Sequence, residues 1–234
     1  MGDDRGTEKS MASRIWTAIV AAVICGGQTM LPFNPASVPF DNRLARVQLS
    51  AGLPKVVTPP HVHLTNRVMI YFEAGTNKIT FQNGEVRPEQ FRAGDVQWND
   101  AMDSHTAEII APGPVNIVHV ELKSPPDMAP TVRYSARDPL KVAATHYKKE
   151  IENNQVRVLR FHLGPGERTA LHEEPFERLI VPLTAAKLIV ADSEGKERTV
   201  AFKQAQLHWV LPGAAAEKNI GVQPYEALIV EFKR

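Results

Sequence analysis

Three histidines in the first half of the chain have the spacing of a metal site. His61 and His63 flank one residue of an extended segment, and because side chains alternate along a strand, both imidazoles lie on one face. His105 follows a turn at Gly94 and a bend at Asn99, so a later antiparallel strand can bring it to the same place. Three neutral imidazoles suit Fe(II), Zn(II), Mn(II), Ni(II) or Cu(II) and leave coordination positions open. The alternative for the first two is a pair of solvated strand histidines.

The elements that must position these histidines are short strands. Apolar residues recur with period two or in short runs, as at 67–72, 115–122 and 227–232. Gly84 and Gly195 mark turns at equivalent places, and the 18 prolines and 14 glycines are spread along the chain. Such strands, separated by turns roughly every 8 to 12 residues, predict an all-β sandwich or barrel.

The chain repeats itself at a constant offset. His61 aligns with His172 and Trp98 with Trp209, each pair 111 positions apart. The same offset aligns Asn42 with Asn153, Arg46 with Arg157, Pro54 with Pro165, Arg67 with Arg178 and Gly84 with Gly195. The repeat predicts two homologous units, 42–123 and 153–234. We interpret 28–41 as an N-terminal extension and 124–152 as a linker with one short helix or strand.

At the histidines the sequence resembles the cupin superfamily, specifically a two-domain bicupin. The first motif of the family is G(x)5HxH(x)3-4E(x)6G, and His61, His63 and Gly75 match it. The second is G(x)5PxG(x)2H(x)3N, and Gly94 and His105 match it. The resemblance implies a tandem of jelly-roll β-barrels with the metal site of unit one on the three histidines.

The family's metal-binding glutamate is missing from unit one. Counted back from Gly75, its position falls on Val68, beside Arg67. The resemblance therefore implies a three-histidine site without a carboxylate, as in cupin dioxygenases whose iron is held by three histidines. We expect Val68, Ile70 and Phe72 to form the pocket wall. Arg67 is a candidate for binding an anionic substrate, or, if it points outward, for a surface or interdomain ion pair.

Unit two lacks most of these ligands. His172 is present, but Glu174 stands at the second histidine, Leu179 at the glutamate and Ala216 at the third histidine. We therefore expect a degenerate, metal-free barrel that stabilises the pair or closes the pocket. Its segment 153–175 also resembles small cupins grouped with beta-alanine degradation proteins.

The N-terminal segment has the pattern of a secretory signal peptide. Arg14 precedes an apolar run at 15–25, and Gly26 and Gly27 follow it, which predicts a signal peptide at 1–27 with Met11 a candidate for the true start. An uncleaved anchor is the alternative. Both place the folded part outside the cytoplasm, so we expect a secreted or periplasmic protein with no stable membrane partner after cleavage.

Charge and composition restrict the function. Lys and Arg number 27 against 26 Asp and Glu, with no basic run, so nucleic acid is not expected as a partner. We expect one divalent ion, Fe(II) favoured over Zn, Mn, Ni or Cu, in a dioxygenase-type oxidoreductase acting on a small organic substrate. The alternative is a non-catalytic cupin that binds a sugar or organic acid, with a structural metal or none. A homodimer remains open.

Overall fold

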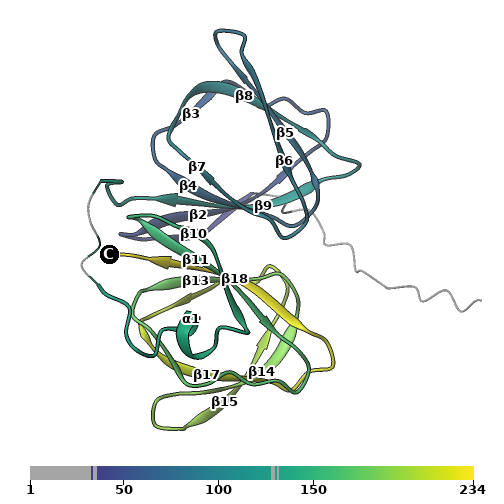
Figure 1. Ribbon diagram of the computed structural model, residues 1–234. Helices are drawn as coiled ribbons and strands as arrows, with labels where there is room; N and C mark the ends of the chain where they lie inside the picture. Colours follow the sequence, from purple (N-terminus) through teal and green to yellow (C-terminus); the bar gives the residue numbers. More distant parts are fainter. Residues whose placement is uncertain (1–32, 34–35, 128–129, 131) are drawn as a thin grey trace, which may run out of the picture. The chain divides into compact units, whose positions relative to one another are not determined.

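The computed structural model describes residue 33, residues 36–127, residue 130 and residues 132–234. The predicted signal peptide lies outside the described residues. Within the described part, regular structure is almost entirely strand, with a single four-residue helix, α1 (Pro139–Val142) (Figure 1). No helix there is both long enough and apolar enough to span a membrane.

The first barrel is built from two antiparallel sheets. A five-stranded sheet has the order β1-β2-β9-β4-β7, and a four-stranded sheet has the order β3-β8-β5-β6. The strands are β1 (Ser37–Asp41), β2 (Ala45–Gly52), β3 (His61–His63), β4 (Arg67–Tyr71), β5 (Gly75–Phe81), β6 (Val86–Phe91), β7 (Val96–Asn99), β8 (Met102–Ile110) and β9 (Val115–Leu122). Both sheets contribute to one core, so the barrel interior is where their facing side chains meet.

The second barrel repeats this plan. Its sheets have the orders β10-β11-β18-β13-β16 and β12-β17-β14-β15. The strands are β10 (Tyr147–Glu152), β11 (Val156–Leu163), β12 (His172–Glu174), β13 (Arg178–Pro182), β14 (Ala186–Ala191), β15 (Glu197–Phe202), β16 (His208–Val210), β17 (Gly213–Asn219) and β18 (Tyr225–Phe232). Strands β2, β3, β4 and β6 recur 111 residues later as β11, β12, β13 and β15 with identical lengths. The predicted all-β duplication is confirmed.

Each five-stranded sheet also extends beyond the predicted unit by one edge strand. Strand β1 lies in the predicted extension and pairs with β2, and β10 lies in the predicted linker and pairs with β11. Most side chains of β1 are exposed, and β10 carries charged side chains at Lys148, Lys149 and Glu150. Strand β1 has only two alternating apolar residues, on either side of Pro39, and β10 is mostly charged, so the sequence pattern marks neither as a strand.

Side-chain alternation divides each five-stranded sheet into an inner and an outer face. In the first barrel Met69 and Tyr71 of β4 point into the core, with Val115 and Ile117 of β9 beside them and Ile109 of β8 opposite. Tyr71 stacks on Phe91 at a ring-centroid distance of 3.9 Å. The inner residues of β4 are therefore the odd-numbered ones, and this parity decides which side chains can reach the histidines.

Candidate metal centre

The structure brings His61, His63 and His105 together. Strand β3 carries the first two on one face, and antiparallel pairing with β8 sets His61 directly opposite His105. The ligand-capable atoms of the three residues all lie within 4.8 Å of one another. The ring centroids are 4.9 Å (His61 to His63), 4.5 Å (His61 to His105) and 5.3 Å (His63 to His105) apart. The cluster expected from the sequence is thus present in the first barrel.

Backbone carbonyls orient two of the three rings. Nδ1 of His61 lies 2.8 Å from the carbonyl oxygen of Pro59, and Nδ1 of His105 lies 2.6 Å from that of Asp103. A carbonyl oxygen can only accept, so each Nδ1 carries the proton and donates it. Nε2 of both rings is then left with a free lone pair, which is the form in which histidine binds a metal.

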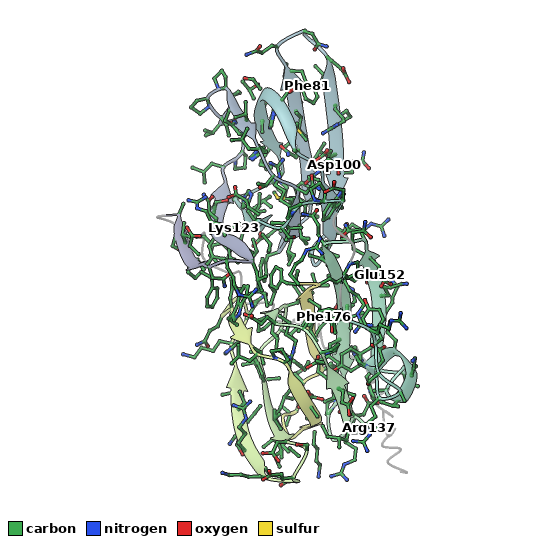
Figure 2. All side chains as sticks on the ribbon, turned by 90° about the vertical axis from the view of Figure 1, so that its left-hand side faces the viewer. Phe81, Asp100, Lys123, Arg137, Glu152 and Phe176 are labelled. Carbon is green, nitrogen blue, oxygen red and sulfur yellow. The ribbon has the colours of Figure 1, made fainter. Side chains whose placement is uncertain are left out.

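The surroundings of His105 favour its neutral imidazole. His105 is only 2% exposed, and burial lowers its pKa, with the positive charges of His61, Arg67 and Arg87 acting in the same direction. Phe81, labelled in Figure 2, ends β5. Its ring lies 5.9 Å from that of His105. His61 and His63 are half-buried, so the cluster has one enclosed side and one side open to solvent. Three such donors fit a divalent transition metal with positions left for other ligands.

Arg67 lies on the inner face of β4, which disagrees with the alternative that it points outward to a surface or interdomain ion pair. It shares the parity of Met69 and Tyr71, which are core residues, and it is 5% exposed. Counted back from Gly75, the first cupin motif places its glutamate on Val68, but the side chain of Val68 lies on the opposite face of β4 from the core cluster. The charged side chain on the inner face at this point of β4 is therefore the guanidinium of Arg67, one residue earlier.

The predicted wall of Val68, Ile70 and Phe72 is consequently corrected. Val68 and Ile70 are completely buried, but they lie on the opposite face of β4 from the core cluster. The equivalent outer face of the second barrel carries Trp209, whose ring lies 5.7 Å from that of Phe40 in the first barrel. These apolar residues therefore lie on the face through which the barrels contact each other. The predicted pocket wall was wrong by one residue, because neighbouring residues of a strand point to opposite faces of the sheet.

Polar atoms without partners accompany Arg67. Among the described residues, Nε and Nη1 of Arg67 and the hydroxyl of Tyr71 are buried and have no hydrogen-bond partner. Burial lowers the pKa of Arg67, although the nearby acidic groups Glu89 and Glu121 oppose this shift. A buried guanidinium with free donors is an uncommon arrangement, because such groups are costly unless a partner arrives.

Other polar side chains of the first barrel already have partners. Glu73 accepts hydrogen bonds from the backbone and side chain of Asn116 at 2.6 and 3.0 Å. Glu108 pairs with Lys78 at 3.5 Å. His119, which the sequence gave no reason to single out, bonds Ser50 at 2.7 Å and sits opposite Met69. In the described part of the chain, no carboxylate joins the histidine cluster.

The second barrel replaces the ligand set with a different polar arrangement. His172 is fully buried and is held by the hydroxyl of Tyr147 at 3.0 Å and the carbonyl of Ala170 at 3.0 Å. Glu174, at the place of the second histidine, forms an ion pair with Arg178 of β13. Alanine stands opposite His172, at Ala215. The sequence did not reveal the role of Tyr147, because it comes from the predicted linker.

The arrangement of the sheets matches several solved structures. AerE from Microcystis aeruginosa is 12% identical, with 81% of this chain and 88% of that chain covered and a TM-score of 0.57. The oxalate decarboxylase of Lactobacillus farciminis in its formate complex is 13% identical, with coverages of 87% and 85% and a TM-score of 0.55. The chain has the two-barrel cupin fold. A cupin 2 conserved barrel domain protein from Leptotrichia buccalis is also similar, at 15% identity, coverages of 85% and 88% and a TM-score of 0.53.

Comparison of sequences does not extend these structural matches. No family model matches the chain, and no curated protein matches it. At these identities the structural likeness establishes the cupin fold alone, so the chemistry must be argued from the residues of this chain.

Proposed function

We propose that the first barrel binds one divalent metal ion through His61, His63 and His105 and acts as a metal-dependent enzyme on a small organic anion. The observation that carries this proposal is the orientation of the imidazoles, two of which are fixed by backbone carbonyls with Nε2 free. Preorganised donors lower the cost of binding an ion, because the two oriented rings need no rearrangement.

Fe(II) is the favoured metal, as the sequence resemblance implies, and Mn(II) is the second to test. A Mn(II) centre is named for the oxalate decarboxylase of Bacillus subtilis, a structural neighbour at 12% identity. When bound, such an ion would supply Lewis acidity and adjacent open positions for substrate and, for iron, for O2. Zn, Ni and Cu also accept three imidazoles, so metal identity is decided by measurement.

The surroundings of Arg67 support the proposal that the substrate is an anion. Its buried guanidinium lies on the inner face of β4, and its Nε and Nη1 atoms have no hydrogen-bond partner in the described part of the chain. A carboxylate entering the barrel would receive two charge-assisted hydrogen bonds and would neutralise the buried charge. The hydroxyl of Tyr71, two residues from Met69 on the same face, offers a further donor. Arg67 would thus bind and orient the substrate.

A non-catalytic binding protein is the second candidate, and the same arginine favours it. A cation close to three imidazoles opposes a divalent ion, and its charge already contributes to the lowered pKa of His105. In that case the first barrel would hold a small organic acid through Arg67, and the histidines would contribute hydrogen bonds only.

Loading experiments separate the two candidates. The chain is loaded anaerobically with Fe(II) or Mn(II), and O2 uptake and CO2 release are measured with dicarboxylates, oxo acids, diketones and hydroxylated aromatics. We expect turnover that is lost in His61→Gln and retained in the matched variant His172→Gln, since the latter removes no member of the cluster. Stabilisation by an organic acid without turnover, unchanged in His61→Gln, would favour the binding protein.

We also propose that the protein is secreted or periplasmic, with cleavage near Gln28. Support comes from the apolar run at 15–25 followed by Gly26 and Gly27. N-terminal sequencing after expression in a bacterial host tests this. A cytoplasmic product that begins at Met1 or Met11 would contradict it.

A further inference from the structure

The second barrel contains a cavity of about 620 Å³. Inward-facing apolar side chains form much of its wall, among them Phe161, Ile180, Leu188, Val190 and Ile229. A volume of this size lies within the range of small-molecule sites in proteins. The barrel that lacks the metal ligands is therefore hollow enough to hold an organic compound.

Three polar atoms on this wall have no partner among the described residues. They are Nε of Arg178, Nε2 of His208 and the hydroxyl of Tyr225, and all three residues line the cavity. Arg178 is 6% exposed and Tyr225 is 1% exposed, so bulk water does not satisfy them. Buried polar groups are normally hydrogen-bonded, so the free donors Nε of Arg178 and the hydroxyl of Tyr225 indicate a ligand with acceptor atoms. Nε2 of His208 donates or accepts according to the tautomer of its ring.

The charge of Arg178 is already compensated. Its Nη2 forms an ion pair with Glu174, and its Nη1 donates to the carbonyl of Leu211 at 2.9 Å. Glu217, also on the wall, accepts from Thr169 at 2.8 Å. Both glutamates would repel an incoming carboxylate, whereas an uncharged oxygen could accept from the free donors without that repulsion. The other charged residues of the lining balance in charge and lie in and beside the turn between β14 and β15; they are Asp192, Lys196, Glu197 and Arg198. The cavity thus disfavours anions, in contrast to Arg67 in the first barrel.

The unpartnered polar atoms are also separated along the barrel. Arg178 pairs with Glu231 near the end of β18, whereas Tyr225 is the first residue of that strand. His208 pairs with Ile180, between these two levels. A ligand that satisfies all of them needs acceptor oxygens at separated points of an apolar body.

We infer that the second barrel binds a small uncharged organic molecule that carries carbonyl or ether oxygens on an apolar body. This site is independent of the metal proposed for the first barrel. It gives the second barrel a recognition role of its own, beyond the stabilising or closing role expected from its lost ligands.

Three probes of matched size test the chemistry. They are para-methoxyacetophenone, which is uncharged with oxygens at both ends, para-methoxybenzoate, its anionic counterpart, and para-ethyltoluene, which has no oxygen. Binding is measured by NMR on the full chain with labelled isoleucine methyls and with chelator present. We expect the ketone to shift Ile180 and Ile229 and to bind about tenfold or more tightly than the other two. No binding of the ketone, or equal binding of the carboxylate, would overturn the inference.

Two variants and one control locate the site. Tyr225→Phe removes a hydroxyl with no partner, so the barrel should fold normally while its affinity for the ketone falls about threefold to tenfold. Tyr71→Phe removes a similarly unpartnered hydroxyl in the first barrel and should leave that affinity unchanged. Val190→Phe, which fills the cavity, should abolish binding. Wild-type affinity in either Tyr225→Phe or Val190→Phe would overturn the assignment.

Discussion

At the scale of single residues, the position that Arg67 occupies has the largest chemical consequence. It is a buried cation on the strand that follows the histidine pair, so its positive charge acts on the imidazole cluster. Its parity along β4 places it inside, beside Met69 and Tyr71. A cation next to a cation site weakens metal binding and strengthens anion binding, and this balance can be measured.

Replacing Arg67 by methionine should therefore change the two affinities in opposite directions. Without the guanidinium, affinity for Mn(II) should rise roughly tenfold, about 1.4 kcal/mol, and affinity for organic anions should fall. Isothermal titration of the metal-depleted protein measures both. Arg67→Lys is the matched control, since it keeps the charge and should keep the weaker metal affinity. Equal metal affinity in wild type and Arg67→Met would show that the charge does not act on the site.

His119 should make stability depend on pH. Burial, together with the positive charges of Arg67 and His61, lowers its pKa from 6.5 to about 4. Between these values the unfolded chain binds the proton more readily, so stability should fall as pH is lowered from 6.5 to 4. In chelator, His119→Gln should show a flatter dependence of Tm on pH over this window. The same slope in both proteins would contradict the prediction.

At the scale of elements, strand pairing accounts for what could be predicted of the site. The HxH spacing puts two imidazoles on one face of β3 in any extended conformation, and the repeat with its turn signals identified the strands around them. The inner face of β4 could not be predicted, because Arg67 to Phe72 is an almost continuous apolar run. Both faces of this strand are buried, one in the core and one toward the other barrel, so hydrophobicity does not distinguish them.

The connection between the barrels contributes a buried charge cluster. Asp138 caps α1 by accepting from the backbone of Leu140 at 3.0 Å, and it also pairs with Arg157 at 2.7 Å. Arg157 is 1% exposed and forms a second ion pair, with the fully buried Glu231. Tyr134 covers the guanidinium, with Cζ 3.9 Å from the ring centroid. This linker is thus attached to β11 and β18 of the second barrel.

Breaking this cluster should be costly. Arg157→Met leaves Glu231 and Asp138 as buried charges without a counter-ion, so the free energy of unfolding should fall by about 3–5 kcal/mol. Urea denaturation measures this change. The matched control is Arg43→Met, which removes an exposed pair with Glu177 and should cost no more than about 1 kcal/mol. A cost for Arg157→Met as small as for Arg43→Met would contradict the interpretation.

At the scale of the whole molecule, duplication has produced two barrels of the same plan with different interiors. The first carries three imidazoles and an arginine with two unpartnered nitrogen atoms, and the second carries a Glu174–Arg178 ion pair and a cavity. Strand order is retained, and five of the nine strands keep their lengths, while the inward side chains differ. The fold could be predicted because it depends on the apolar periodicity of the strands and on the turns between them. The cavity of the second barrel and its unpartnered polar atoms could not be predicted, because they leave no pattern in the sequence.

The two interiors should therefore act independently. His172→Gln removes the partner of Tyr147 and should lower Tm by a few degrees, since one buried hydrogen bond contributes roughly 1 kcal/mol. Its metal content should equal that of wild type. Thermal denaturation and metal analysis of the same preparation check both parts, and loss of metal in this variant would contradict the division between barrels.

Metal content of the purified chain tests the central claim most directly. Protein prepared without chelator should carry about one divalent ion per chain, and His105→Ala should carry almost none, because two remaining imidazoles bind too weakly to retain it. Circular dichroism should show the same strand content in both proteins. Full metal content in His105→Ala, or a wild-type chain that takes up no Fe(II) or Mn(II) when these are supplied, would contradict the three-histidine centre.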